Sequence, residues 1–209
     1  MAHIFITGIG TDVGKSVVSA IVTEALKADY WKPIQSGDLD HSDTHKVLEL
    51  ISNSKKRQFH PCAYELNTPM SPHASAKIDG VKIDINKIKR PTTDNHLVIE
   101  GAGGLLVPLS KDANLADLIT PSDKVILVSR HYLGSINHTL LSCEYLKSKN
   151  IEFAILFVGE EHPSTESIIS KRNQAPVLGR VPIASILDKK FIKDQASILV
   201  SSLLKWIKK

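Results

Sequence analysis

The sequence predicts an α/β fold in which one parallel sheet is covered by helices on both faces. Short, continuously apolar runs alternate with helical patterns along the 209 residues, and such runs are typical of strands buried on both sides. The first run, 3–7, leads through a glycine-rich loop into a helical pattern over 17–26. We find no repeat, linker or low-complexity tract, so we expect a single domain over 1–209.

After the first helix, the pattern predicts a short strand and a second helix. The strand over 30–35 contains Pro33, which cannot donate a hydrogen bond to a neighbouring strand, so we expect the strand to end there or to lie at an edge. The helix is predicted over 43–51, with Ser42 as its N-cap. Its inward-facing residues are expected to be Val47, Leu48 and Ile51.

Residues 52–95 are the least regular part of the chain and contain four prolines. Short helices are predicted over 74–78 and 83–88. A long irregular segment inside a compact domain often carries a substrate site.

The regular alternation returns after residue 95. The predicted strands are 96–100, 124–129, 152–158 and 177–179, and the predicted helices are 136–147, with Ser135 as a candidate N-cap, and 192–206.

Composition narrows the class of protein. The net charge of +4 is scattered and no basic stripe with interleaved aromatics is present, so we expect no nucleic-acid partner. There is no run of 18 apolar residues and no basic segment followed by an apolar one at the start, so we expect a cytoplasmic protein with no membrane partner. Cys62 and Cys143 lie outside any C-x-x-C pattern, which predicts two buried free thiols.

The stretch from Gly8 to Ser16, G-I-G-T-D-V-G-K-S, has the features of a phosphate-binding loop. Glycines let successive backbone N–H groups point at one anion, and the following helix adds its own free donors. Lys15 would reach the β- and γ-phosphates, and the Ser16 hydroxyl would bind Mg²⁺. The usual spacing needs glycine at position 9, where Ile9 stands, so the loop is a variant that is one residue longer. The alternative is a glycine-rich turn without a ligand.

Ligands of an open parallel sheet bind outside the carboxyl ends of its strands, which selects further candidates. Glu100 ends an apolar strand and could hold Mg²⁺ beside Ser16, or it could be a surface carboxylate. Asp43 is a second candidate ligand, although an aspartate at a helix start also simply favours the helix dipole. Lys32 could neutralise a transferring phosphoryl group, or it could extend from an edge strand to solvent.

Together these segments resemble one family, the dethiobiotin synthetases, which are ATP-dependent enzymes with a P-loop NTPase fold. The matching stretches are T-G…T-D-V-G-K-S (7–16), K-P-I-Q-S-G (32–37), S-D (42–43), S-P-H (71–73), E-G-A-G-G (100–104) and L-G-S-I-N-H (133–138). They occur in the family's order along nearly the whole chain. The resemblance implies carboxylation and ring closure of 7,8-diaminopelargonate with CO₂ or bicarbonate to dethiobiotin. The implied route runs through a carbamate and a carbamic–phosphoric anhydride and releases ADP and phosphate.

The resemblance also implies roles for individual residues. Lys15 and Lys32 would stabilise the transferring phosphoryl group, and Thr11 and Ser36 would hydrogen-bond the phosphate and the carbamate. The implied ligands of Mg²⁺ are Ser16, Asp43 and Glu100. The residues implied to bind ATP are Asp12, Val13, Gly14, Lys15, Ser16, Val17, Asp43, Glu100, Gly101, Ala102, Gly103, Gly159, Glu160, Pro182 and Ile183. Those implied to bind the substrate are Ser36, Pro72, Gly103, Gly134, Ser135, Ile136 and Asn137, the last four across the interface of a homodimer.

The chain departs from the family pattern on the side of the nucleotide base. Familiar members carry Asn-Asp where this chain has Gly159-Glu160, and the asparagine side chain reads adenine. We therefore expect the nucleotide to be held mainly by its phosphates. Glu160 could reach the base or ribose, and Pro182 and Ile183 could pack on it.

Other classes of P-loop protein fit less well. A switch ATPase of the partition type, acting through dimerisation and partner binding, would carry a second lysine where Gly10 stands. A cobyrinate-type amidoligase would need a further domain, and a nucleoside kinase would need an arginine-rich lid. The partition-type ATPase is kept as the alternative.

Overall fold

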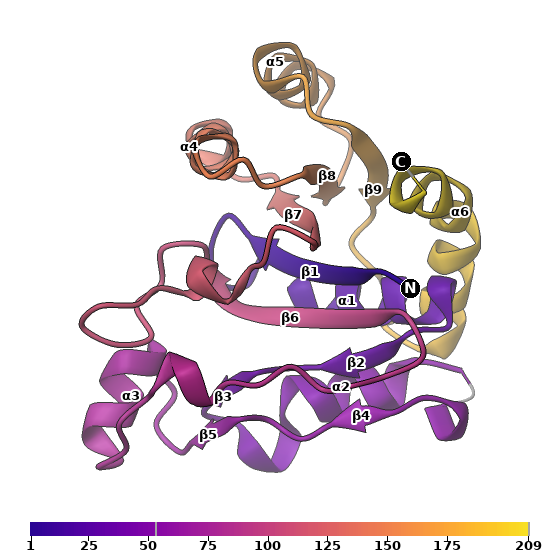
Figure 1. Ribbon diagram of the computed structural model, residues 1–209. Helices are drawn as coiled ribbons and strands as arrows, with labels where there is room; N and C mark the ends of the chain where they lie inside the picture. The colour runs from indigo at the N-terminus through magenta and orange to yellow at the C-terminus, as the bar shows by residue number, and fades with distance from the viewer. Residues whose placement is uncertain (53, 209) are drawn as a thin grey trace.

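The computed structural model describes residues 1–52 and 54–208, and its centre is a parallel sheet of seven strands (Figure 1). The strands are β1 (His3–Gly8), β2 (Asp29–Trp31), β4 (Phe59–His60), β6 (Leu97–Gly104), β7 (Lys124–Arg130), β8 (Phe153–Val158) and β9 (Val177–Val181). Their order across the sheet is β4-β2-β6-β1-β7-β8-β9, so the first strand of the chain lies in the middle. The predicted α/β fold is confirmed.

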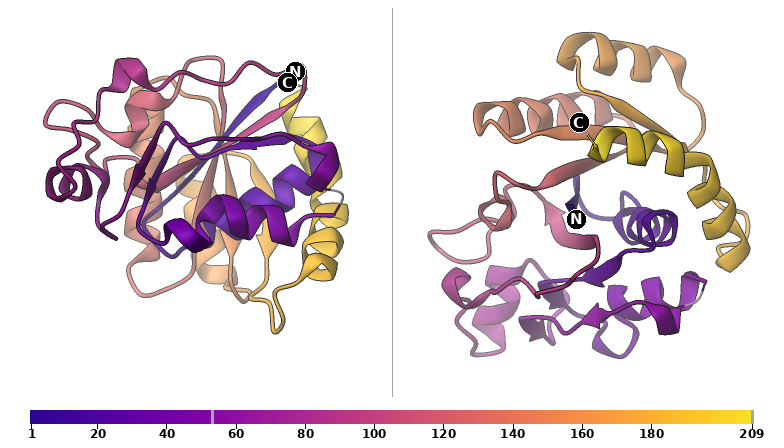
Figure 2. Two further views of the ribbon diagram at one scale, coloured as in Figure 1. Left: turned by 90° about the horizontal axis from the view of Figure 1, so that it is seen from below. Right: turned by 45° about the vertical axis from the view of Figure 1, so that its right-hand side comes forward.

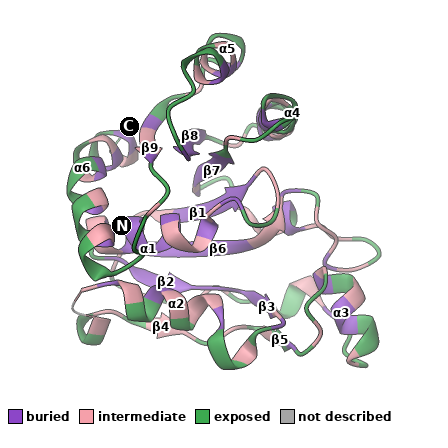
Figure 3. Cartoon of the chain, turned by 180° about the vertical axis from the view of Figure 1, so that it is seen from behind, coloured by how far each residue is buried: buried purple, intermediate pink, exposed green. Residues whose placement is uncertain are grey.

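Helices cover both faces of the sheet, as predicted. One face carries α1 (Lys15–Leu26), α2 (Asp43–Leu50) and α6 (Lys189–Ile207), and the other carries α4 (Ser135–Ser148) and α5 (Pro163–Asn173) (Figure 2). Alternation along the strands supplies the two cores, since Ile4 and Ile6 of β1 pack toward α1 while Phe5 packs on the opposite face. Figure 3 shows the central strands β1, β6, β7 and β8 largely buried and the outer surfaces of the helices exposed.

The predicted strand over 30–35 is two strands that belong to different sheets. β2 ends before Pro33 and lies inside the large sheet between β4 and β6. The chain resumes as β3 (Ile34–Ser36), which pairs in parallel with β5 (Tyr64–Leu66). The expected end at the proline is thus confirmed. This small sheet and α3 (Pro72–Ile78) lie at the carboxyl ends of β1, β2 and β6 (Figure 1).

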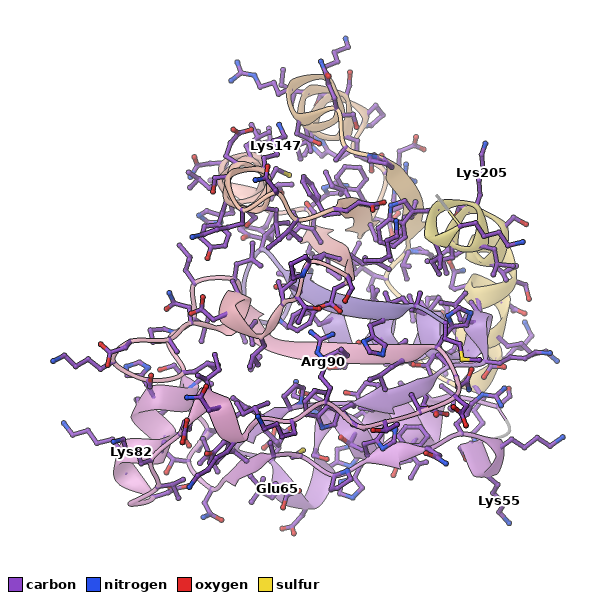
Figure 4. All side chains as sticks on the ribbon, viewed as in Figure 1. Lys55, Glu65, Lys82, Arg90, Lys147 and Lys205 are labelled. Atoms are coloured by element: carbon purple, nitrogen blue, oxygen red, sulfur yellow. The ribbon has the colours of Figure 1, made fainter. Side chains whose placement is uncertain are left out.

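The segment 54–95 contains more structure than its sequence predicts. The helix predicted over 74–78 is α3, and a 3-10 turn at Ile85–Lys87 replaces the helix predicted over 83–88. The segment is tied to the sheet by Arg90, whose guanidinium contacts the buried carboxylate of Asp123 and donates to the carbonyl oxygen of Leu118 at 2.7 Å. In Figure 4, Arg90 lies over β6, whereas Lys55 and Lys82 project outward.

Four smaller expectations are wrong. Leu48 is exposed, because α2 packs mainly against α1 and buries Val47 and Ile51 but not Leu48. The N-cap of α4 is Gly134 rather than Ser135, and its φ of 99° favours glycine. β6 continues to Gly104 rather than ending at residue 100. Cys143 is buried as predicted, but Cys62 is only half-buried.

The structure contains one helix that the sequence did not predict, namely α5. Among the described residues, no helix is both long and apolar enough to cross a membrane.

Candidate active site

The glycine loop wraps around the side chain of Lys15. The Lys15 ammonium donates to the carbonyl oxygen of Gly10 at 2.7 Å, which curls the loop over the start of α1. A Cβ on Gly8 would approach Val13 to 2.5 Å, and Gly14 has a φ of 95°, so both positions need glycine. Burial lowers the pKa of Lys15 to about 8, against the opposing effect of the Glu100 carboxylate. The loop therefore holds a buried cation next to free helix donors, which suits a phosphate.

Beside the loop, two carboxylates converge on one serine and one lysine. The Ser16 hydroxyl lies 2.9 Å from an oxygen of Asp43 and 2.9 Å from an oxygen of Glu100. The Lys32 ammonium lies 2.5 Å from the second Asp43 oxygen and 3.2 Å from Glu100. The structure therefore brings together the residues that the sequence selected from four separate segments.

The charges in this cluster support one another. Burial alone would lower the pKa of Lys32, but the carboxylates of Glu100 and Asp43 outweigh it and raise that pKa. Burial alone would raise the pKa of Asp43, but Lys32 and the Ser16 hydrogen bond hold it below its usual value. Lysine and carboxylate thus both remain charged.

Secondary structure explains why these side chains meet. Lys32 follows β2 and Glu100 lies in β6, and the two strands are paired with Trp31 opposite Ile99. Asp43 is the first residue of α2, where Ser42 accepts a hydrogen bond from the backbone N–H of His45, so the predicted cap is confirmed. The carboxylates therefore reach Ser16 from rigid elements.

Tyr30 and Lys46 complete the cluster and were not predicted. The Tyr30 hydroxyl donates to the second oxygen of Glu100 at 2.9 Å, inside the core. The Lys46 ammonium lies 3.8 Å from Asp43. A sequence signal for Tyr30 exists, because residues two apart on a strand share a face and Lys32 is two residues further on.

The donor set fits magnesium. Over residues 1–52 and 54–208, no three His, Cys, Asp or Glu side chains gather as a metal site, so protein carboxylates alone would not hold the ion. Magnesium usually takes one or two carboxylates and completes its shell with substrate phosphates and water. Ser16, Asp43 and Glu100 offer that partial shell beside the phosphate loop.

A cavity of about 660 Å³ opens over this cluster. It lies between the glycine loop, the small β3–β5 sheet and the start of α3. The predicted site residues that line it are Thr11, Asp12, Gly14, Lys15, Ser16, Val17, Lys32, Ser36, Asp43, Pro72, Glu100, Ala102 and Gly103, and the structure adds Ile34, Gln35, Lys46, Pro69, Met70, Ser71 and Val107.

The remaining predicted site residues lie outside this cavity. Val13 and Gly101 are buried within the fold. The stretch 134–137 opens α4, next to a second cavity of about 600 Å³ that Tyr132, His138 and Leu141 help to line. Those at the carboxyl ends of β8 and β9 are Gly159, Glu160, Pro182 and Ile183.

An ion-pair network lies beneath this last group. The backbone N–H of Gly159 donates to the carbonyl oxygen of Val181 at 3.0 Å, which joins the two strand ends. Glu166 of α5 accepts hydrogen bonds from Arg180 at 2.7 and 3.1 Å and lies 2.9 Å from the His131 ring. Sequence reasoning missed this network because it missed α5.

Comparison with known proteins gives both family and fold. A family model described as AAA domain matches residues 2–190. The ATP-dependent dethiobiotin synthetase BioD of Christiangramia forsetii is 61% identical over 193 residues, which cover 92% of this chain and 93% of that protein. The enzyme of the same name from Cytophaga hutchinsonii is 50% identical over 181 residues, covering 85% and 87%.

Among solved structures, the similarity extends to proteins of other function. The MinC:MinD cell division protein complex of Aquifex aeolicus has a TM-score of 0.56 at 13% identity, covering 100% of this chain and 96% of that one. A plasmid partition protein from Borrelia burgdorferi has a TM-score of 0.55 at 17% identity, covering 98% of each. At these identities the likeness shows a shared fold.

Proposed function

The chain belongs to the dethiobiotin synthetase family, and we propose that it makes dethiobiotin from 7,8-diaminopelargonate and CO₂ with ATP through a carbamate and a carbamic–phosphoric anhydride. Membership makes it an ATP-dependent ligase that forms dethiobiotin. The observation that carries the finer proposal is the buried Lys32, whose ammonium lies between Asp43 and Glu100 beside the phosphate loop.

The first steps form and activate the carbamate. One substrate amine attacks CO₂ and loses a proton, which gives a carbamate anion. A carbamate oxygen then attacks the γ-phosphorus of ATP, the bond to the bridging oxygen breaks, and ADP leaves. No general base is needed at this second step, because the attacking oxygen is already anionic. Phosphoryl transfer of this kind depends mainly on positioning and on charge neutralisation.

The residues of the cavity supply both requirements. Lys15 would contact the β- and γ-phosphates, and Lys32, held between Asp43 and Glu100, would face the transferring group. The Ser36 hydroxyl is buried and has no hydrogen-bond partner among the described residues, which suits a bond to the carbamate, and Thr11 would hydrogen-bond the phosphate. Ser16, Asp43 and Glu100 would hold Mg²⁺, which neutralises phosphate charge when bound.

The last step closes the ring. The second amine attacks the carbonyl carbon of the anhydride, the bond from that carbon to the phosphate oxygen breaks, and inorganic phosphate leaves. The amine loses its proton and the cyclic urea of dethiobiotin remains.

The substrate carboxylate has a candidate site at the start of α4. Gly134, Ser135, Ile136 and Asn137 form the first turn of this helix, where backbone N–H groups favour an anion. These residues lie outside the main cavity, which supports a site shared between the two chains of a homodimer. Exposed apolar side chains surround the start of the helix, namely Leu106, Leu133, Ile136 and Leu141.

The deciding experiment is phosphate release from purified protein with Mg²⁺ and bicarbonate, measured with and without 7,8-diaminopelargonate. We expect release that depends on the diamine, with dethiobiotin identified by mass spectrometry. Running ATP, GTP and CTP in parallel tests the base: because Gly159 lacks a side chain, we expect rates within about tenfold of one another, which is about 1.4 kcal/mol of discrimination.

The same assay distinguishes the proposed ligase from the alternative, a partition-type switch ATPase. A rate of phosphate release that is the same with and without the diamine, together with dimerisation that requires ATP, would favour a partition-type switch ATPase. Release with ATP alone among the three nucleotides would keep the enzyme assignment and contradict recognition through the phosphates.

A further inference from the structure

A buried tyrosine stands behind one of the two carboxylates of the site. Tyr30 is fully buried in β2, and its ring packs on Phe59 with centroids 5.7 Å apart. Its hydroxyl donates to Oε2 of Glu100 at 2.9 Å. The other oxygen of Glu100 faces the cavity, where Ser16 and Lys32 contact it. The two oxygens of this carboxylate therefore have different partners.

We propose that Tyr30 is a positioning residue that holds Glu100 oriented toward the divalent cation. The inference rests on the proposed function, in which Glu100 helps to hold Mg²⁺. It assigns a role in cation affinity to a side chain that lines neither cavity described above.

The geometry follows from strand pairing. Tyr30 and Lys32 are two residues apart, so both side chains point to the same side of β2 as Glu100 does in the neighbouring β6. Lys32 follows the last residue of β2 and reaches the cavity, whereas Tyr30 lies one step deeper and reaches the rear of the carboxylate. Glu100 is thus held from two directions by one neighbouring strand.

A carboxylate held in this way is oriented for one ligand. Partners that fix metal-binding side chains typically raise metal affinity 10–100-fold. Without the Tyr30 hydroxyl, Oε2 would be a buried charged oxygen without a partner, which is costly. The carboxylate would then turn to satisfy Oε2, most readily toward Lys32, and Oε1 would leave its place beside Ser16.

The test is Tyr30→Phe, which removes the hydroxyl and keeps the ring against Phe59. Binding of Mn²⁺ to the enzyme–ADP complex is measured by the electron paramagnetic resonance signal of the free ion. Binding of ADP in EDTA is measured by calorimetry. We expect the Mn²⁺ dissociation constant to rise 10–100-fold, with ADP affinity in EDTA within threefold of wild type.

The matched control is Tyr64→Phe. The Tyr64 hydroxyl accepts a hydrogen bond from the backbone of Asp84 at 2.9 Å, so the same group is lost away from the carboxylates. Both constants should stay within threefold of wild type. In a Glu100→Gln background, Tyr30→Phe should have no further effect on Mn²⁺ binding.

Two results overturn the inference: a Mn²⁺ constant within threefold of wild type, or a metal-free ADP affinity that falls as much as the Mn²⁺ affinity. If Tyr30→Phe fails to fold, a measurement on the protein without substitutions still tests the inference. In protein labelled with fluorotyrosine, the Tyr30 ¹⁹F signal should shift when Mg²⁺ is added to the ADP complex and the Tyr64 signal should not. A Tyr30 signal indifferent to Mg²⁺ also overturns it. None of these readouts needs the diamine, so failure of dethiobiotin formation is seen separately.

Discussion

Lys32 and a bound divalent cation would compete for the same two carboxylates, those of Asp43 and Glu100. The lysine ammonium already contacts Asp43 and Glu100, and Ser16 contacts both as well. When a cation takes these oxygens, electrostatic repulsion favours movement of Lys32 toward the phosphates. In the proposed function, this one side chain would stabilise the site before the nucleotide binds and neutralise the transferring group afterwards.

Replacing this lysine should separate the two roles. We expect Lys32→Met to lower kcat by about 10²–10³-fold, because a preorganised cation at the transferring group is lost. We also expect the free energy of unfolding to fall by about 3–5 kcal/mol, since two buried carboxylates lose their cation. Added Mg²⁺ should restore part of that loss.

Turnover and thermal unfolding, each measured with and without Mg²⁺, check this prediction. The exposed Lys55→Met is the control and should change neither quantity. A Lys32→Met enzyme with turnover within tenfold of wild type, or with a Tm that Mg²⁺ leaves unchanged, would contradict it.

The charged residues of the site could be predicted from the sequence, because strand ends in a parallel sheet meet at one edge. Lys15, Ser16, Lys32 and Glu100 lie at or just after the ends of β1, β2 and β6 and converge as that rule requires, whereas Asp43 reaches the site from the start of α2. Tyr30 could not be found by the rule, because it lies before the strand end and binds the rear of a carboxylate.

At the scale of elements, α5 shows what sequence patterning misses. Only Thr165, Ile169 and Asn173 of this helix are buried, so no apolar stripe marks it. β4 and β5 were missed for another reason, since strands of two and three residues are too short to show alternation. The formation of α5 and of these two short strands therefore depends on tertiary contacts rather than on local sequence pattern.

The ion pairs that fix α5 should make stability depend on pH. Burial raises the pKa of Glu166, but Arg180 and His131 outweigh burial and hold it below the ordinary value of 4.5. A lowered carboxyl pKa stabilises the fold above the unfolded pKa, and that stabilisation is lost as pH falls through the folded value. Glu166→Gln should therefore cost up to about 1 kcal/mol at pH 7, and progressively less below pH 4.5.

Chemical denaturation across pH 3–8 measures this difference. The control is Glu144→Gln, which removes an exposed pair with Lys147 on α4 and should change the free energy of unfolding by less than about 0.5 kcal/mol. A Glu166→Gln difference that stays constant from pH 7 to pH 3 would rule out the ion pair as its origin.

At the scale of the whole molecule, the apolar surface around the start of α4 bears on assembly. Leu133 is fully exposed and Leu141 is 62% exposed, and Leu141 also lines the second cavity. Exposed apolar groups gathered next to a cavity are typical of an interface. A homodimer would bury them and bring the first turn of α4 near a partner's substrate.

A charge on this surface should separate the chains. We expect Leu141→Lys to be a monomer in size-exclusion chromatography with light scattering. We also expect the variant to raise the KM for the diamine at least about tenfold, because a central interface contact is lost. The control is Ile198→Lys, equally exposed on α6, which should leave both quantities unchanged. A monomeric wild type, or a dimeric Leu141→Lys with unchanged KM, would contradict the shared site.

The central position of β1 also has a consequence for how the chain folds. Its neighbours in the sheet, β6 and β7, follow it by about 90 and about 120 residues, so its contacts have high contact order. At about 5–20 residues per second, a newly synthesised β1 leaves the ribosome roughly 5–20 s before β6. The glycine loop attached to β1 cannot take its shape until then. The nucleotide site therefore cannot form until about half of the chain has been made, and nascent chains that end before β6 should depend on chaperones to avoid aggregation.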